Sequence, residues 1–277
     1  MIEERIMFMK DTYPAQRKPM RSDKGRPQLT QRDDDLLLVI GEQTGYSFSQ
    51  LQGLLARHPD TQSIDPAFLS GSRTYALIQR WKKLGLIQYD KIYYHDPGWI
   101  WLTRKGLAHV HLSLRYLDLY HADLEHLFWI NETRALIQDS YGSRPGFHWE
   151  SERVLRAMRE RLHAQRKREP DLWLPFEYRG AHRPDALLRY RTSEESDAPE
   201  MVSAVEVECS RKEPRIWKKI FLDLTQFYSN AHYYVAPEIK ASFVHALTKF
   251  QEEEPAYGEP SATRRQYIYV HDLEQRL

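Results

Sequence analysis

The chain has 277 residues, of which 41% are hydrophobic and 29% are charged, as in ordinary water-soluble globular proteins. Its 40 Lys and Arg residues almost balance its 39 Asp and Glu residues, which excludes a globally cationic protein but not local basic patches. No apolar run is long enough to span a membrane, and Met1–Lys10 has no apolar signal-peptide core. Because Cys209 is the only cysteine, internal disulfides and cysteine-based zinc sites are excluded, and we expect a cytoplasmic protein without membrane contact.

The pattern along the chain predicts four regions. Residues 1–32 mix charges and prolines without apolar periodicity, which is typical of a flexible arm. The basic residues of this arm are compatible with a polyanion contact and equally with a solvated tail. A first domain is predicted over 33–112, a helical connector over 113–144 and a second domain over 145–277. Helices and strands in this order predict an α/β protein of the α+β kind.

The first domain is predicted to contain three short helices followed by a β-hairpin. The helices begin near Asp33, at Ser47 or Ser49, and near Ser70, and Gly85 ends the third one. Strands are expected over 86–94 and 99–103. The third helix has an apolar stripe that we expect in the core, made of Tyr75, Leu77, Ile78, Trp81 and Leu84.

This order of elements, with the Arg-Trp-Lys-Lys-Leu-Gly-Leu-Ile sequence at 80–87 and Leu-Thr-Arg-Lys-Gly at 102–106, resembles the winged helix-turn-helix family. The resemblance implies that the third helix enters the major groove of double-stranded DNA. The expected DNA contacts are Arg73, Arg80, Lys82 and Lys83 on that helix, with Lys91 and Arg104 reaching phosphates from the wing. A winged helix that binds only protein, with these cations solvated, is the alternative.

Two further groups of polar residues lie outside this domain. A helix predicted to open at His148 carries seven basic residues and one acidic residue over 153–168, so Arg156 and Arg159 are candidate phosphate contacts unless this face is simply solvated. In the connector, His126, Asn131 and Arg134 stand among large apolar residues. We interpret these three as hydrogen-bonding groups at a domain junction rather than as a catalytic set.

Several acidic residues lie in the predicted strands of the second domain or next to them. Strands are expected over 174–178, 185–191 and 201–209, the last two as an antiparallel hairpin. The two-residue period places Glu206 and Glu208 on one face, with Asp185 opening the neighbouring strand and Glu152 on the preceding helix. If a helix covers that face, paired carboxylates would be costly without a cation. We therefore expect Asp185, Glu206 and Glu208 to bind Mg²⁺ or Mn²⁺ and, together with Glu152, to be catalytic candidates.

The Pro184-Asp185 pair followed by Glu206-Val207-Glu208 resembles the PD-(D/E)xK nuclease signature, and the order of elements is similar over 145–275. Glu208 stands where that pattern has lysine, and Lys212, Lys218 or Lys219 is the candidate replacement. An active metal-dependent endonuclease and a nuclease-like domain kept for DNA binding or assembly therefore both stay open. Beyond this hairpin, 214–229 and 237–253 are predicted helices and 232–236 and 266–271 predicted strands, joined as parallel crossovers.

Scattered motifs over 33–230 resemble the replication-relaxation family of plasmids and integrative elements: Leu-Glu-His at 124–126, Trp-Glu-Ser-Glu-Arg at 149–153, Arg-Pro-Asp at 183–185 and Val-Glu-Val-Glu at 205–208. The resemblance implies a DNA-binding protein of a mobile element that acts in replication, mobilisation or their regulation. Double-stranded DNA, other replication or mobilisation proteins and a second copy in a homodimer are the partners it suggests. A magnesium-dependent endonuclease or nickase and a protein-interaction adaptor are the alternatives.

Overall fold

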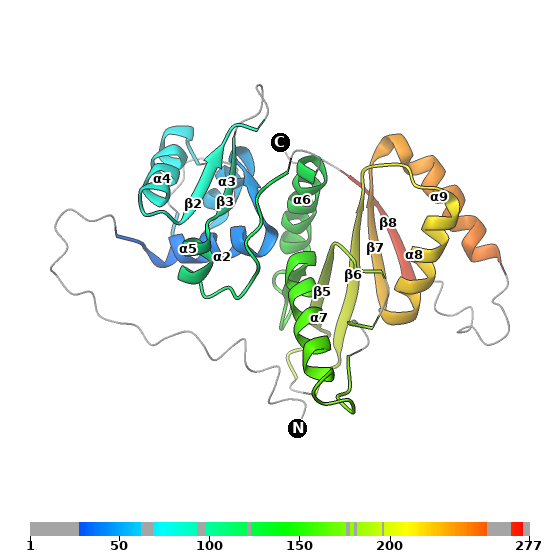
Figure 1. Cartoon of the computed structure of the whole chain (residues 1–277). Coiled ribbons are helices and arrows are strands. Elements are labelled where there is room, and N and C mark those ends of the chain that lie inside the picture. Colours follow the sequence, from blue (N-terminus) through cyan, green and yellow to red (C-terminus); the bar gives the residue numbers. More distant parts are fainter. Residues whose placement is uncertain are drawn as a thin grey trace.

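The computed structural model describes residues 28–61, 69–92, 98–120, 123–175, 178–179, 182–195, 197–253 and 267–273. Within these ranges the protein is a mixed α+β structure of eight helices and two sheets, which confirms the predicted fold class. The two sheets lie side by side with helix α6 between them (Figure 1). Among these same residues, no helix is both long enough and apolar enough to cross a membrane. The basic cluster of the predicted arm lies outside the described residues.

The smaller sheet is antiparallel and has three strands in the order β1-β3-β2. Its elements are α2 (Gln31–Gln43), β1 (Tyr46–Ser47), α3 (Phe48–Arg57), α4 (Gly71–Lys83), β2 (Ile87–Asp90), β3 (Trp99–Leu102) and α5 (Arg104–His109). The apolar sides of the helices and the strands enclose one core around Leu37, Ile40 and Trp81, each fully buried. The three helices and the hairpin predicted for this region are therefore confirmed.

Local capping signals set the helix ends in this half. Thr30 caps α2 in a capping box with Asp33, so the helix begins two residues earlier than predicted. Ser47 rather than Ser49 caps α3. Gly85 has a φ of 71°, the left-handed conformation that lets glycine follow the end of a helix. The prediction of Tyr75 in the core is wrong, since its side chain is 49% exposed and its ring lies edge-on to that of Tyr89.

The larger sheet has five strands in the order β4-β5-β6-β7-β8. The elements are α6 (Leu124–Tyr141), β4 (His148–Ser151), α7 (Glu152–Arg166), β5 (Ala186–Arg191), β6 (Glu200–Glu208), α8 (Pro214–Phe227), β7 (Asn230–Val235), α9 (Pro237–Glu252) and β8 (Ile268–Asp272). Strands β4, β5 and β6 are antiparallel neighbours, whereas β6, β7 and β8 run parallel, joined by α8 and α9 as predicted. Helix α6 packs on one face of the sheet, and α7, α8 and α9 pack on the other.

Two predictions for this half are wrong. The segment at His148 opens no helix but forms β4, with Trp149 paired to Leu188, and the helix starts only after Ser151, whose hydroxyl caps it. No strand forms at 174–178 in its described residues, and β4 is the neighbour of β5 on the side away from β6. Leu174 and Tyr178 are buried there as core-covering groups instead.

Buried hydrogen bonds join the two halves. Asn131 on α6 donates from Nδ2 to the carbonyl of Gly45 at 3.0 Å and to Gln50 Oε1 at 3.1 Å. Gln43 donates to Asn131 Oδ1 at 3.2 Å and accepts from Trp149 Nε1 at 3.1 Å. Arg134 forms an ion pair with Glu42, with Nη2 3.1 Å from Oε2. The interpretation of Asn131 and Arg134 as junction residues is confirmed.

Candidate functional site

Glu206 and Glu208 lie on β6 and point to the face of the sheet that α8 and α9 cover. The alternation along β6 is as predicted, because Val205 and Val207 pack on the opposite side, toward α6. Glu206 is 5% exposed and Glu208 is fully buried. Two carboxylates thus stand on a covered face, the situation in which a compensating positive charge is required.

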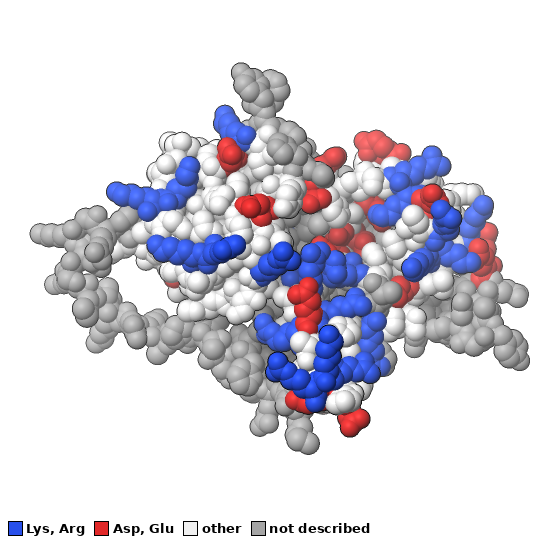
Figure 2. Space-filling view, in the orientation of Figure 1, with Lys and Arg blue, Asp and Glu red and all other residues white. Residues whose placement is uncertain are grey.

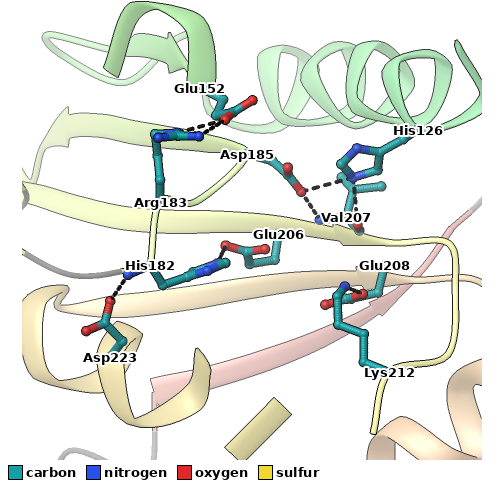
Figure 3. A network of polar contacts seen from close by, with 10 residues as sticks. All are labelled: His126, Glu152, His182, Arg183, Asp185, Glu206, Val207, Glu208, Lys212 and Asp223. Atoms are coloured by element: carbon teal, nitrogen blue, oxygen red, sulfur yellow. Dashed lines mark hydrogen bonds and ion pairs between the residues drawn. The ribbon is translucent and has the colours of Figure 1, made fainter. Parts of the chain in front are cut away.

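Each carboxylate of the predicted site has its own cationic neighbour (Figure 3). Asp185, directly before β5, accepts a hydrogen bond from the amide of Val207 at 2.8 Å, and its Oδ2 lies 3.3 Å from His126 Nε2. The Nε2 atom of His182 lies 2.7 Å from Glu206 Oε1. Glu208 forms a close ion pair with Lys212, four residues along the chain.

The pKa values in this cluster follow from burial and from these pairings. Burial and, after it, the nearby charge of Asp185 raise the pKa of Glu206 to about 7, against the opposing effect of His182. Burial also raises the pKa of Glu208, against the attraction of Lys212. Burial alone would lower the pKa of His126, but its hydrogen bond and charge interaction with Asp185 prevail and raise it to about 9. The pKa of His182 is raised in the same way by Glu206.

The predicted metal ligands do not form one ligand set. Across the part of the chain that the structure describes, no three His, Cys, Asp or Glu side chains converge as the ligands of a metal ion do. Asp185 turns toward His126 on the α6 side, whereas Glu206 and Glu208 are paired with His182 and Lys212. In this arrangement each of the three carboxylates faces a protein cation instead of sharing one ion.

Glu152, the fourth predicted acid, is directed to arginines rather than to the other carboxylates (Figure 3). Its Oε1 atom lies 2.6 Å from Arg183 Nη2 and 2.9 Å from Arg156 Nη2. Glu152 and Asp185 nevertheless share the lining of one pocket of about 100 Å³ between the two halves, together with Arg153 and Arg156. Of the four predicted acids, only Glu152 and Asp185 therefore line this pocket, and the ion pairs of Glu206 and Glu208 do not.

Two histidines of this cluster were not predicted as site residues. His182 was overlooked although it lies three positions before Asp185, and His126 was assigned only to the junction. Their proximity to the carboxylates depends on the packing of α6 and of the loop before β5, which no local pattern reveals. Two buried oxygens here lack hydrogen-bond partners, Glu208 Oε1 and the Tyr233 hydroxyl.

The predicted DNA contacts lie on the surface with one exception. Lys82, Lys83, Arg73, Lys91, Arg104 and Arg156 are exposed and Arg159 is half-buried. Arg80 instead forms an ion pair with Asp33, which is fully buried, so its guanidinium is held against the core and not presented to DNA. Lys and Arg side chains gather on one face over α4, over α5 and along α7 (Figure 2).

Comparisons with protein-family models, with curated proteins and with solved structures find no match to this chain. The functional argument therefore rests on the residues and on their arrangement.

Proposed function

We propose that this protein binds double-stranded DNA, with a winged helix as its reading module and α7 as a second phosphate-binding element. The observation that carries the proposal is the basic face that extends over α4, α5 and α7 (Figure 2). Lys and Arg side chains that lie together over these helices favour a polyanion, although the net charge of the chain is only +1. The motifs shared with the replication-relaxation family support a role in plasmid replication, mobilisation or their regulation.

The order of elements supports the winged-helix assignment. Helices α2, α3 and α4 precede the hairpin of β2 and β3, and α4 exposes Lys82 and Lys83 while burying Leu77, Ile78 and Trp81. A helix with a buried apolar side and an exposed basic side is suited to lie in the major groove. In the second half, an antiparallel hairpin followed by parallel strands, with acids on β6, supports a PD-(D/E)xK-like domain.

Helix α7 is held in a fixed position against the first half. The Ser151 hydroxyl, at the start of α7, donates to the carbonyl of Glu42 at 2.6 Å. Arg153 donates to the carbonyl of Gly41 and, at 2.7 Å, to that of Arg115. Because these bonds join α7 to the end of α2, the basic residues of α4 and α7 keep one spacing, and a single duplex is expected to contact both.

The test is duplex binding as a function of salt concentration. We expect the affinity to fall steeply with salt, and the slope of log K against log salt to drop by about one for each phosphate contact removed. The double substitutions Lys82→Ala/Lys83→Ala and Arg156→Ala/Arg159→Ala should each weaken binding and reduce this slope. Lys240→Ala is the control, because Lys240 lies on α9, outside α4, α5 and α7, and pairs with Asp272 of β8. Unchanged binding in both double variants would contradict the proposal, and absence of duplex binding would favour the protein-interaction adaptor.

Metal-dependent strand cleavage is a second candidate, favoured by the buried and unpartnered Oε1 of Glu208 beside Lys212. Supercoiled plasmid incubated with the protein and Mg²⁺ or Mn²⁺ separates the two candidates. We expect binding without nicking, since each carboxylate is already paired with a protein cation. Nicking that disappears in Asp185→Ala and in Glu206→Ala would instead establish an endonuclease.

A further inference from the structure

A row of aromatic side chains lies on the α6 face of the larger sheet, beyond the end of α6. The row is formed by Tyr141 at the end of α6, Tyr190 on β5, His232 and Tyr234 on β7, and Tyr269 and His271 on β8. None of these residues takes part in the carboxylate cluster or in the basic face described above. The row therefore requires a separate explanation.

The rings follow one another across the strands at stacking distances. The ring centroids of Tyr141 and Tyr190 are 5.5 Å apart, and those of Tyr141 and His232 are 6.4 Å apart. His232 stacks on Tyr269 at 5.0 Å with an interplanar angle of 20°. His271 stacks on Tyr234 at 4.7 Å with an angle of 21°. The rings thus form one chain of aromatic contacts, stacked between β7 and β8 and tilted or edge-on around Tyr141.

This surface is open to solvent at one end. Tyr269 is 44% exposed, whereas Tyr141, Tyr190 and His271 are half-buried. Burial lowers the pKa of His232 to about 4, with a further contribution from the charge of His271, and burial lowers the pKa of His271 as well. Both imidazoles are therefore neutral at pH 7 and present uncharged aromatic faces.

A positively charged side chain lies against the aromatic row. The exposed Arg144 places its guanidinium carbon 5.1 Å from the ring centroid of Tyr141 and 4.9 Å from that of Tyr190. On this face of the sheet, the described residues of β5, β6, β7 and β8 include no carboxylate, because Asp272 points to the opposite side, where Lys240 pairs with it. Aromatic rings combined with an arginine and without an acid are the chemistry that stacks unpaired bases and attracts their phosphates.

We propose that this aromatic row is a binding surface for an unpaired nucleic-acid strand, whose bases stack on Tyr269 and Tyr190 while Arg144 contacts the backbone. The proposal goes beyond duplex binding by α4 and α7, since its ligand is single-stranded and it uses different residues. A protein with both surfaces holds a duplex and a neighbouring melted strand together.

Fluorescence anisotropy with a labelled oligothymidine tests this surface directly. We expect the wild-type protein to bind the oligothymidine more tightly than an abasic oligonucleotide of the same length, because stacking requires bases. Tyr269→Ala and Tyr190→Ala should each weaken oligothymidine binding by about 5- to 100-fold, the range found when one stacking partner is removed. Tyr269→Phe should keep the affinity, since it keeps the ring.

The controls separate this proposal from the proposed duplex binding. Tyr75→Ala removes a similarly exposed tyrosine from α4, 49% exposed against 44% for Tyr269, and should leave oligothymidine binding unchanged. Arg144→Glu reverses a charge at an exposed position and should weaken binding of the single strand without unfolding the sheet. Duplex affinity should be the same in Tyr269→Ala, Tyr190→Ala and Arg144→Glu. The proposal would be overturned if the wild-type protein bound the abasic strand as tightly as the oligothymidine. It would also be overturned if Tyr269→Ala and Arg144→Glu both bound the oligothymidine with wild-type affinity, whatever the result with duplex DNA.

Discussion

His126 is the residue in which position and charge are most closely linked. Its Nε2 atom is 2.9 Å from the carbonyl oxygen of Val207 and 3.3 Å from the carboxylate of Asp185, so one side chain on α6 contacts both β5 and β6. The positive form of the imidazole is favoured there, and its pKa rises to about 9. Protonation of His126 therefore strengthens the contact between α6 and the sheet.

This linkage predicts how stability depends on pH. A histidine whose pKa is raised on folding contributes stability that is complete below its unfolded value near 6.5 and is lost as the pH rises through about 9. The difference in free energy of unfolding between wild type and His126→Gln should shrink over this range by about 1 kcal/mol, because the side chain is 42% exposed and solvent screens the pair. Urea unfolding at several pH values measures it, and a difference that is constant with pH would contradict the prediction.

Individual residues also show how much of the site could be predicted from the sequence. A serine before an apolar segment indicates a helix cap, and Ser47 was one of the two serines predicted for that role. The two-residue period of a strand predicts the common face of Glu206 and Glu208. The pairing of Arg80 with Asp33 was not predicted, because 47 residues separate the two. The need for positive charge beside buried carboxylates was predictable, and Lys212 was one of the three candidate lysines, whereas His182 depends on a loop that no period describes.

The position of helix α5 depends on a close approach between the backbone at Gly106 and the backbone at Leu86. Gly106 lies so near the start of β2 that a Cβ atom added to it would be 2.0 Å from the carbonyl oxygen of Leu86. The Thr103 hydroxyl caps the helix by accepting from the Gly106 amide at 3.0 Å. The helix that follows β3 can therefore pack against the hairpin only if this position has no side chain.

Gly106→Ala should consequently lower the free energy of unfolding by about 2 kcal/mol or more, because the backbone must move to relieve the contact. Gly71→Ala is the matched control. A Cβ there would meet nothing closer than Gln52 Nε2 at 4.0 Å, and alanine in a helix reduces the entropy of the unfolded chain. Thermal unfolding of both variants measures the effect, and equal midpoints would show that the approach at Gly106 relaxes without cost.

Element type was predictable where the apolar period extends over several turns, as in α4 and α8. It was not predictable for β4, because four residues are too few to distinguish a strand from the first turn of a helix. The short apolar segment at 174–178 has the composition of a strand, yet the sheet has no free edge for it beside β5. Which strands are neighbours is a property of the whole sheet rather than of the segment.

For the whole molecule, the buried polar network at the junction determines whether the two halves act as one. Asn131 is 3% exposed and bonds to Gly45, Gln50 and Gln43, while Gln43 also accepts from Trp149 in the other half. Polar groups buried in this way stabilise only when all their partners are present. Together with the bonds of Ser151 and Arg153 to α2, this network holds the two halves in one arrangement, and the proposed binding of one duplex by α4 and α7 requires that arrangement.

Asn131→Ala should therefore uncouple the two halves. It removes one hydrogen bond each from the Gly45 carbonyl, Gln50 and Gln43, at a cost of about 1–3 kcal/mol for each group left unpaired where water cannot reach. The wild-type protein is expected to unfold in one transition, with far-ultraviolet circular dichroism and tryptophan fluorescence coincident in urea. In the variant the two signals should separate into two transitions, and duplex affinity should fall although no DNA-contacting residue is changed. Glu125→Ala, exposed on the same helix, should behave as wild type. Coincident curves at the wild-type midpoint in Asn131→Ala would mean that packing alone couples the halves.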